Sequence, residues 1–150
     1  MSRPKRAATT PTDAHEQILL AVETLEKGLT RIASRRPRAW RQHLLRDLRP
    51  VDECLRAHCA AAERRGGTLA DVEIVIGRLS EVTVARSEHD ALTALAADFF
   101  ATIEHGRDAA NLSAEERHCG ARFAEALRRH LLVEIDLLQI RFILDVGVVD

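Results

Sequence analysis

The chain has 150 residues and a mass of 16.7 kDa, the size of one ordinary domain. Hydrophobic residues make up 46% and charged residues 30%, a balance that excludes a disordered acidic tail and allows a substantial buried core. Apolar runs are far shorter than the roughly 20 residues a bilayer-spanning helix needs, and no signal core follows the polar start. We therefore expect a soluble, cytoplasmic protein with no membrane partner.

Charge is distributed unevenly although the net charge is only -1. The first fifty residues carry eleven Lys and Arg against five Asp and Glu. These basic residues fall mainly in the first six positions and in residues 35–38, where a solvated tail and a loop explain them. With no Tyr and one Trp there is little on which bases could stack, so nucleic-acid binding is disfavoured.

The three cysteines, Cys54, Cys59 and Cys119, are an odd number without CxxC spacing. This pattern indicates neither a disulfide framework nor a zinc ribbon. We interpret them as small buried thiols.

The N-terminal half predicts a basic arm followed by two helices. Residues 1–12, with two prolines and three threonines, are predicted to be a mobile arm, and residues 13–150 a single helical bundle. Asp13 and Glu16 have the spacing of a capping box, and one apolar stripe predicts a helix over about 14–33: Ile18, Val22, Leu25, Leu29 and Ile32. A second stripe predicts a helix over about 39–64, kinked at Pro50 and stopped by Gly66 and Gly67.

The C-terminal half predicts two more helices. The periodic pattern from Thr68 to His105 is too long for one rod in a compact bundle, so we expect a break near Gly77, a helix over about 80–105 and a stop at Gly106. Ser113 and Glu116 form a second capping box that opens a helix over about 114–143. No strand pattern appears, and the prediction is an all-α, up-down-up-down four-helix bundle.

Each predicted helix carries one histidine on or beside its apolar stripe: His15, His58, His89 and His130. A single core histidine is more often bonded to a backbone carbonyl than to a metal, but one on every helix indicates a shared site. Glu134, four residues after His130, lies on the same helix face and needs a cation. That cation is either a metal ion or Arg86 in a structural ion pair.

Imidazoles and a carboxylate in an apolar interior suit a first-row transition metal, with iron favoured over zinc where a coordination position stays open. A ferritin-like site would need two Glu-x-x-His pairs, and only Glu115-x-x-His118 fits, off the apolar stripe. His43, His105 and His118 are predicted to be solvated. There is no nucleophile–base pair and no glycine-rich phosphate loop, so hydrolase and kinase functions have no support.

Four short motifs occur in order along the chain: His15, "LRAHCAAAE" around His58, "SEHDAL" around His89 and "LRRHLLVEIDLL" around His130 and Glu134. This ordered set resembles the hemerythrin-like cation-binding domain over residues 13–144. The resemblance implies a non-heme di-iron centre between four helices, with a carboxylate bridging the metals and an open position for dioxygen, peroxide or nitric oxide. Members of that family act as oxygen carriers or sensors, iron-responsive modules and peroxide- or nitrosative-stress proteins.

This chain departs from the family pattern at two positions. The family has His-x-x-x-Glu on its second helix, whereas Ala62 stands fourth after His58 and Glu63 follows, about 140° round an ideal helix from His58. Thr93 stands where the oxygen carriers have a second histidine on the third helix, which disfavours oxygen transport of that form. The site is therefore either an adapted di-iron centre that uses Glu63 or a weakened descendant that holds one metal ion or none.

The predicted metal ligands are His15, His58, Glu63, His89, His130 and Glu134. The predicted function is non-heme iron binding, with two ions expected and one or none allowed for, and with a small gas or peroxide as the partner. Any enzymatic activity would be iron-dependent oxidoreduction of peroxide or dioxygen. The alternative is a metal-poor bundle that serves as a protein-interaction or regulatory module.

Overall fold

The structure is a computed structural model that describes residues 11–30, 37–65, 67–70, 79–106 and 114–146. Four long helices account for most of these residues: α1 (Pro11–Thr30), α2 (Pro37–Glu63), α4 (Leu79–His105) and α5 (Ala114–Val146). A single helical turn at 68–70 lies between α2 and α4, and the described ranges contain no strand. The all-helical prediction is confirmed.

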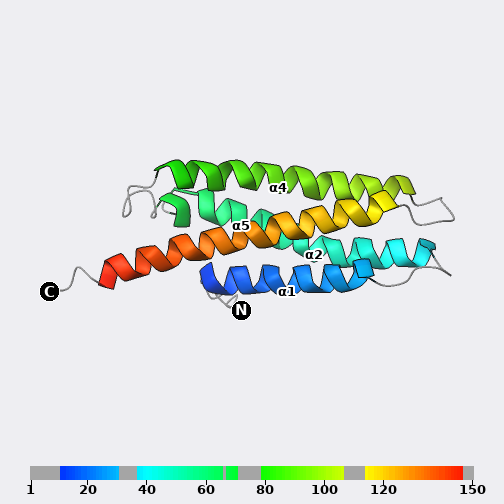
Figure 1. Cartoon of the computed structure of the whole chain (residues 1–150), viewed down its shortest axis with the longest axis horizontal. Coiled ribbons are helices and arrows are strands. Elements are labelled where there is room, and N and C mark those ends of the chain that lie inside the picture. Colours follow the sequence, from blue (N-terminus) through cyan, green and yellow to red (C-terminus); the bar gives the residue numbers. More distant parts are fainter. Residues whose placement is uncertain (1–10, 31–36, 66, 71–78, 107–113, 147–150) are drawn as a thin grey trace, which may run out of the picture.

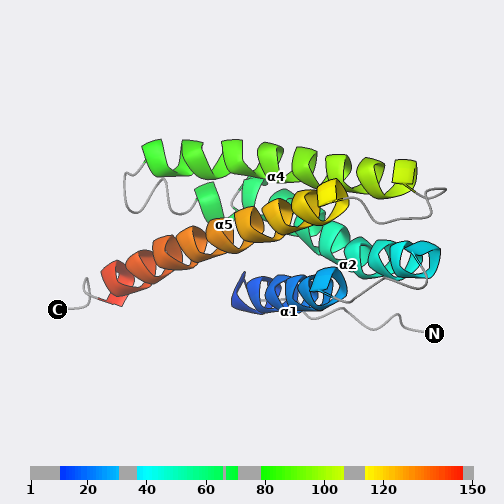
Figure 2. The ribbon, with the colours of Figure 1, turned by 45° about the vertical axis from the view of Figure 1, so that its right-hand side comes forward.

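The helices lie side by side as a bundle (Figures 1 and 2). Helix α1 packs on α2 and α5, and α4 packs on the same two helices. The colour ramp shows that consecutive helices run in opposite directions along the bundle (Figure 1). The beginning of α1 and the end of α2 therefore lie at the same end of the molecule.

The predicted helix bounds differ from the observed ones by a few residues. Helix α1 begins at Pro11, inside the segment predicted as an arm, so Asp13 lies within the helix rather than capping it. Proline suits a first helical turn because the amide hydrogen it lacks would have no intrahelical acceptor there. Helix α2 continues through Pro50, and α5 extends to Val146, three residues beyond its predicted end. Gly77, Ser113 and residues 1–10 lie outside the described residues.

The end of α2 shows why glycine is needed at that stop. The Gly67 amide donates to the Arg64 carbonyl over 2.7 Å. A Cβ at Gly67 would lie 2.5 Å from the Ala61 carbonyl oxygen and 2.6 Å from that of Ala62, closer than any side chain tolerates. The predicted stop is confirmed at Gly67, with the last helical residue at Glu63, whereas Gly66 lies outside the described residues.

Two apolar clusters make up the core. The larger joins all four long helices and includes Leu55, Leu92 and Leu131 with four residues of the predicted α1 stripe: Ile18, Val22, Leu25 and Leu29. Ile32, the fifth residue of that stripe, lies outside the described residues. A smaller cluster contains four buried residues and the partly buried Leu138: Ala62, Leu69, Val82 and Ala85. Burial of a side chain such as Leu or Ile stabilises the fold by about 1.5–3 kcal/mol, so these faces drive the helices together. The cysteines form no disulfide and are half-buried rather than fully buried as predicted.

One buried ion pair was not anticipated from the sequence. Arg41 on α2 and Glu116 on α5 are both 1% exposed, and the guanidinium donates from Nε to Oε1 and, over 3.0 Å, from Nη2 to Oε2 of the carboxylate. Glu116 was predicted to cap α5, but its side chain points into the bundle. The burial of Arg41 could have been predicted from its helical spacing, because Arg41 precedes Leu44 by three residues and Leu48 by seven on the buried stripe.

Candidate metal centre

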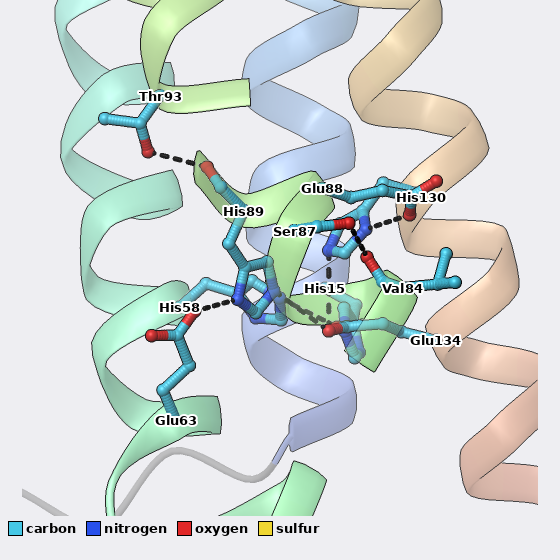
Figure 3. Close-up of polar contacts among 10 residues, drawn as sticks. All are labelled: His15, His58, Glu63, Val84, Ser87, Glu88, His89, Thr93, His130 and Glu134. Carbon is cyan, nitrogen blue, oxygen red and sulfur yellow. Dashed lines mark hydrogen bonds and ion pairs between the residues drawn. The ribbon is translucent and has the colours of Figure 1, made fainter. Parts of the chain in front are cut away.

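Four buried histidines and one buried glutamate meet between the helices (Figure 3). His15 comes from α1, His58 from α2, His89 from α4, and His130 and Glu134 from α5. His15 lies near the start of α1 and His58 near the end of α2, which the antiparallel arrangement brings to the same level. The convergence expected from the stripes is what the structure shows.

The imidazoles form a closely spaced cluster. Ring centroids are 4.9 Å apart for His15 and His58, 5.5 Å for His58 and His89, and 4.8 Å for His89 and His130. The planes of these pairs are inclined by 59° or more, so the rings present nitrogens toward one another rather than stacking. The nitrogen-rich interior is therefore a single site.

The carboxylate of Glu134 lies at the centre of this cluster. Its Oε2 accepts a hydrogen bond of 2.9 Å from His15 Nε2 and lies 2.8 Å from His58 Nε2. Its Oε1 accepts a hydrogen bond of 3.1 Å from His89 Nε2 and lies 3.4 Å from His130 Nε2. Each carboxylate oxygen is thus approached by one pair of imidazoles.

The surroundings of Glu134 keep it ionised. Burial alone would raise the pKa of its carboxyl, but the approaching imidazoles of His130, His15, His58 and His89 together lower that pKa far below its ordinary value of 4.5. The pKa of His89 moves in the opposite direction: burial would lower it, but contact with Glu134 and Glu63 raises it above 6.5. Glu134 is therefore a buried carboxylate whose negative charge attracts a cation, either the imidazolium of His89 or a metal ion.

Two further carboxylates contact the outer sides of the rings. Glu63 Oε1 accepts a hydrogen bond of 2.5 Å from His89 Nδ1, and Glu88 Oε2 accepts one of 2.8 Å from His130 Nδ1. Glu63 was predicted as a ligand, but the structure places it behind the ring of His89 rather than beside Glu134. Glu88 stands next to His89 on α4, but its carboxylate contacts His130 on the neighbouring helix α5.

The chemistry of the donors fits a metal ion. His58, His89, His130 and Glu134 are buried, and each offers one ligand atom within 4.8 Å of the others. Because metal–nitrogen and metal–oxygen bonds are about 2.0–2.2 Å long, these four atoms would have to move closer together to share one ion. The Nε2 atoms of His58 and His130 are buried without a hydrogen bond, as is Nδ1 of His15. A buried imidazole nitrogen that has no hydrogen-bond partner can bind a metal ion once it is deprotonated.

Apolar residues close the centre on two sides along the bundle. Leu55, Leu92 and Leu127 of the larger cluster each lie three residues from a histidine of the centre, on one side of it. Ala62, Val82 and Leu138 of the smaller cluster lie on the other. Ala62, where the family pattern has a glutamate, thus belongs to an apolar layer. This low-dielectric enclosure strengthens the attraction between Glu134 and a cation.

The remaining predicted residues lie apart from the centre. His43, His105 and His118 are exposed, as predicted. Cys59 follows His58 but does not belong to the ligand group, and burial, together with the charges of Glu63 and Glu134, raises the pKa of its thiol to about 12. Thr93 donates its hydroxyl hydrogen to the His89 carbonyl over 2.9 Å.

None of the long helices, over the residues described, is apolar enough for a membrane span. Comparison with family models, with curated proteins and with solved structures found no match to this chain. The interpretation of the centre therefore rests on its own geometry and chemistry.

Proposed function

We propose that this protein binds a non-heme metal ion, iron in the first place, among its four helices, and that it binds or reacts with a small oxidant or gas there. The observation that carries the proposal is the arrangement around Glu134, where one imidazole from every long helix approaches a single buried carboxylate. This arrangement concentrates four buried imidazoles around one buried carboxylate. When bound, iron would supply a redox-active Lewis acid for dioxygen, peroxide or nitric oxide.

The candidate ligands support two metal positions of unequal affinity. His58, His89, His130 and Glu134 together could hold one ion. His15 and Glu134 Oε2, 2.9 Å apart, offer the beginning of a second position with fewer protein donors. We therefore propose that the chain binds one ion tightly and a second ion more weakly, with Glu134 between them. In this form the chain would resemble the hemerythrin-like proteins.

Metal analysis with matched histidine variants tests the proposal. The purified protein, supplied with ferrous iron, is expected to contain between one and two iron ions per chain and to develop near-ultraviolet absorption on exposure to air. His130→Ala is expected to lose the iron, whereas His43→Ala, an exposed histidine on α2, should retain it. Circular dichroism would establish that both variants keep the helical fold. Iron content unchanged in His130→Ala would overturn the proposed site.

A specific observation also favours the alternative of a metal-poor interaction module. His89 donates from both ring nitrogens to carboxylates, so it can stabilise the cluster as an imidazolium without a metal. Wild-type protein that holds only trace metal after growth in iron, cobalt or zinc would favour this second function.

A further inference from the structure

The outer nitrogens of two core histidines have carboxylate partners from neighbouring helices. Glu63, the last residue of α2, reaches His89 on α4, and Glu88 on α4 reaches His130 on α5 (Figure 3). In both rings the contact is made by Nδ1, while Nε2 faces Glu134. The two pairs therefore have the same orientation relative to the centre.

This orientation has a chemical consequence. An imidazole whose Nδ1–H donates to a carboxylate keeps its hydrogen on that side, which leaves the Nε2 lone pair for a metal ion. The hydrogen bond also restricts rotation of the ring and makes the metal-facing nitrogen more basic. A carboxylate in this position acts on the metal only through the histidine.

The geometry separates Glu63 and Glu88 from the ligands themselves. Their side chains are 42% and 29% exposed, whereas that of Glu134 is 5% exposed. An imidazole ring stands between each of these carboxylates and Glu134. His15 provides the contrast, because its Nδ1 is buried and has no hydrogen-bond partner.

We propose that Glu63 and Glu88 are positioning residues of the metal centre, which hold His89 and His130 with Nε2 toward the metal and so set its affinity. This inference rests on the proposed function. It assigns Glu63 a role different from the ligand role that the family resemblance implies, and it gives Glu88 a role in the centre.

Cobalt affinity measures the contribution of each carboxylate. Co²⁺ would be titrated into wild type, Glu63→Ala and Glu88→Ala against a competing chelator, with binding followed by visible absorption. Each variant is expected to bind Co²⁺ about 10–100-fold more weakly than wild type. Glu53→Ala and Glu104→Ala, exposed glutamates on α2 and α4, are the matched controls and should bind as wild type does.

Imidazole NMR supplies a readout that a merely structural role would not move. In the diamagnetic Zn²⁺-loaded wild type, His89 and His130 are expected to show Nδ1–H resonances shifted downfield by their carboxylate partners. Glu63→Ala should move only the His89 resonance, and Glu88→Ala only that of His130. Glu63→Gln and Glu88→Gln keep a neutral acceptor and should give intermediate shifts and intermediate affinities.

The outcomes separate this inference from the proposed function. If wild type binds neither Co²⁺ nor Zn²⁺, the proposed function fails and this inference fails with it. If wild type binds and the alanine variants match their controls in affinity and ring resonances, only the positioning role is overturned. Complete loss of one bound ion in Glu63→Gln, with the His89 ring resonance unchanged, would show instead that Glu63 is a ligand.

Discussion

His15 differs from the other core histidines in the surroundings of its ring. Its Nε2 donates to Glu134, but its Nδ1 is buried without a partner, and it does not belong to the four-residue ligand group. His89 and His130, in contrast, are held by carboxylates on their outer nitrogens. A ligand without such support binds a metal more weakly, so we place the weaker ion on the His15 side.

We expect His15→Ala to remove the weaker ion and keep the firmly held one. Iron or cobalt titration of wild type should show two phases of unequal affinity, and the variant should show only the tighter phase, with about one ion per chain by metal analysis. Loss of all metal in His15→Ala would contradict the division of the centre, and equal stoichiometry in both proteins would show that His15 binds no ion.

At the scale of the helices, the Arg41–Glu116 pair joins α2 to α5 away from the histidines. Both side chains are at most 2% exposed, so neither charge is solvated on its own. Gly106, at the end of α4, allows the pair to lie close by, since a Cβ there would come within 2.3 Å of Glu116 Oε1. Three helices thus depend on this interaction at one level of the bundle.

We expect Arg41→Met to lower the free energy of unfolding by about 3–5 kcal/mol, because it removes the guanidinium that pairs with the buried Glu116 carboxylate. The double variant Arg41→Met/Glu116→Leu should recover most of that loss, because a buried apolar pair needs no solvation. Urea unfolding of the metal-free single and double variants measures both changes. Metal stoichiometry should stay at the wild-type value, and a double variant as unstable as the single one would refute the argument.

The four long helices share one polar layer, which lies between two apolar clusters. The apolar cores on either side exclude water, and the layer between them contains the imidazoles and Glu134. The turn after α2 contributes Leu69, 2% exposed, to the smaller core. The end of the bundle is therefore closed by apolar packing at the position where the family pattern would place a carboxylate.

For the whole molecule, the centre links stability to pH. Because the pKa of His89 is raised on folding, its stabilising contribution to the folded state is fully present below 6.5, the pKa in the unfolded chain. This contribution is lost as the pH rises through the pKa in the folded protein. Because the pKa of Glu134 is lowered on folding, its stabilising contribution to the folded state is fully present above 4.5, the pKa in the unfolded chain. This contribution is lost progressively as the pH falls from 4.5 toward the pKa in the folded protein. Both contributions are complete only between these two values.

We therefore expect this centre to stabilise the metal-free protein most at about pH 4.5–6.5. We also expect the gain in melting temperature on adding metal to increase from about pH 5.5 to about pH 7.5. The second trend follows because the metal must displace hydrogens from imidazole nitrogens. Thermal unfolding with and without Zn²⁺ across this range measures both trends, with His130→Ala as the control that should show no metal-dependent gain. A gain independent of pH would contradict binding through the histidines.

Helical periodicity alone determined the all-helical architecture and the burial of the four histidines and Glu134, because a 3.6-residue repeat fixes the angle at which each side chain leaves its helix. It also identified the exposed histidines correctly. It did not fix how far each helix is shifted along its neighbours, since that depends on turn lengths and on packing between elements distant in sequence.

Only the tertiary structure decided the contacts that depend on those shifts. It divided the oxygens of Glu134 between two pairs of imidazoles, turned Glu63 and Glu88 toward histidines on other helices, and paired Arg41 with Glu116. Apart from the contact between His130 and Glu134, which both lie on α5, these contacts join side chains from different helices. Their separations follow from the axial register, which no single helix encodes.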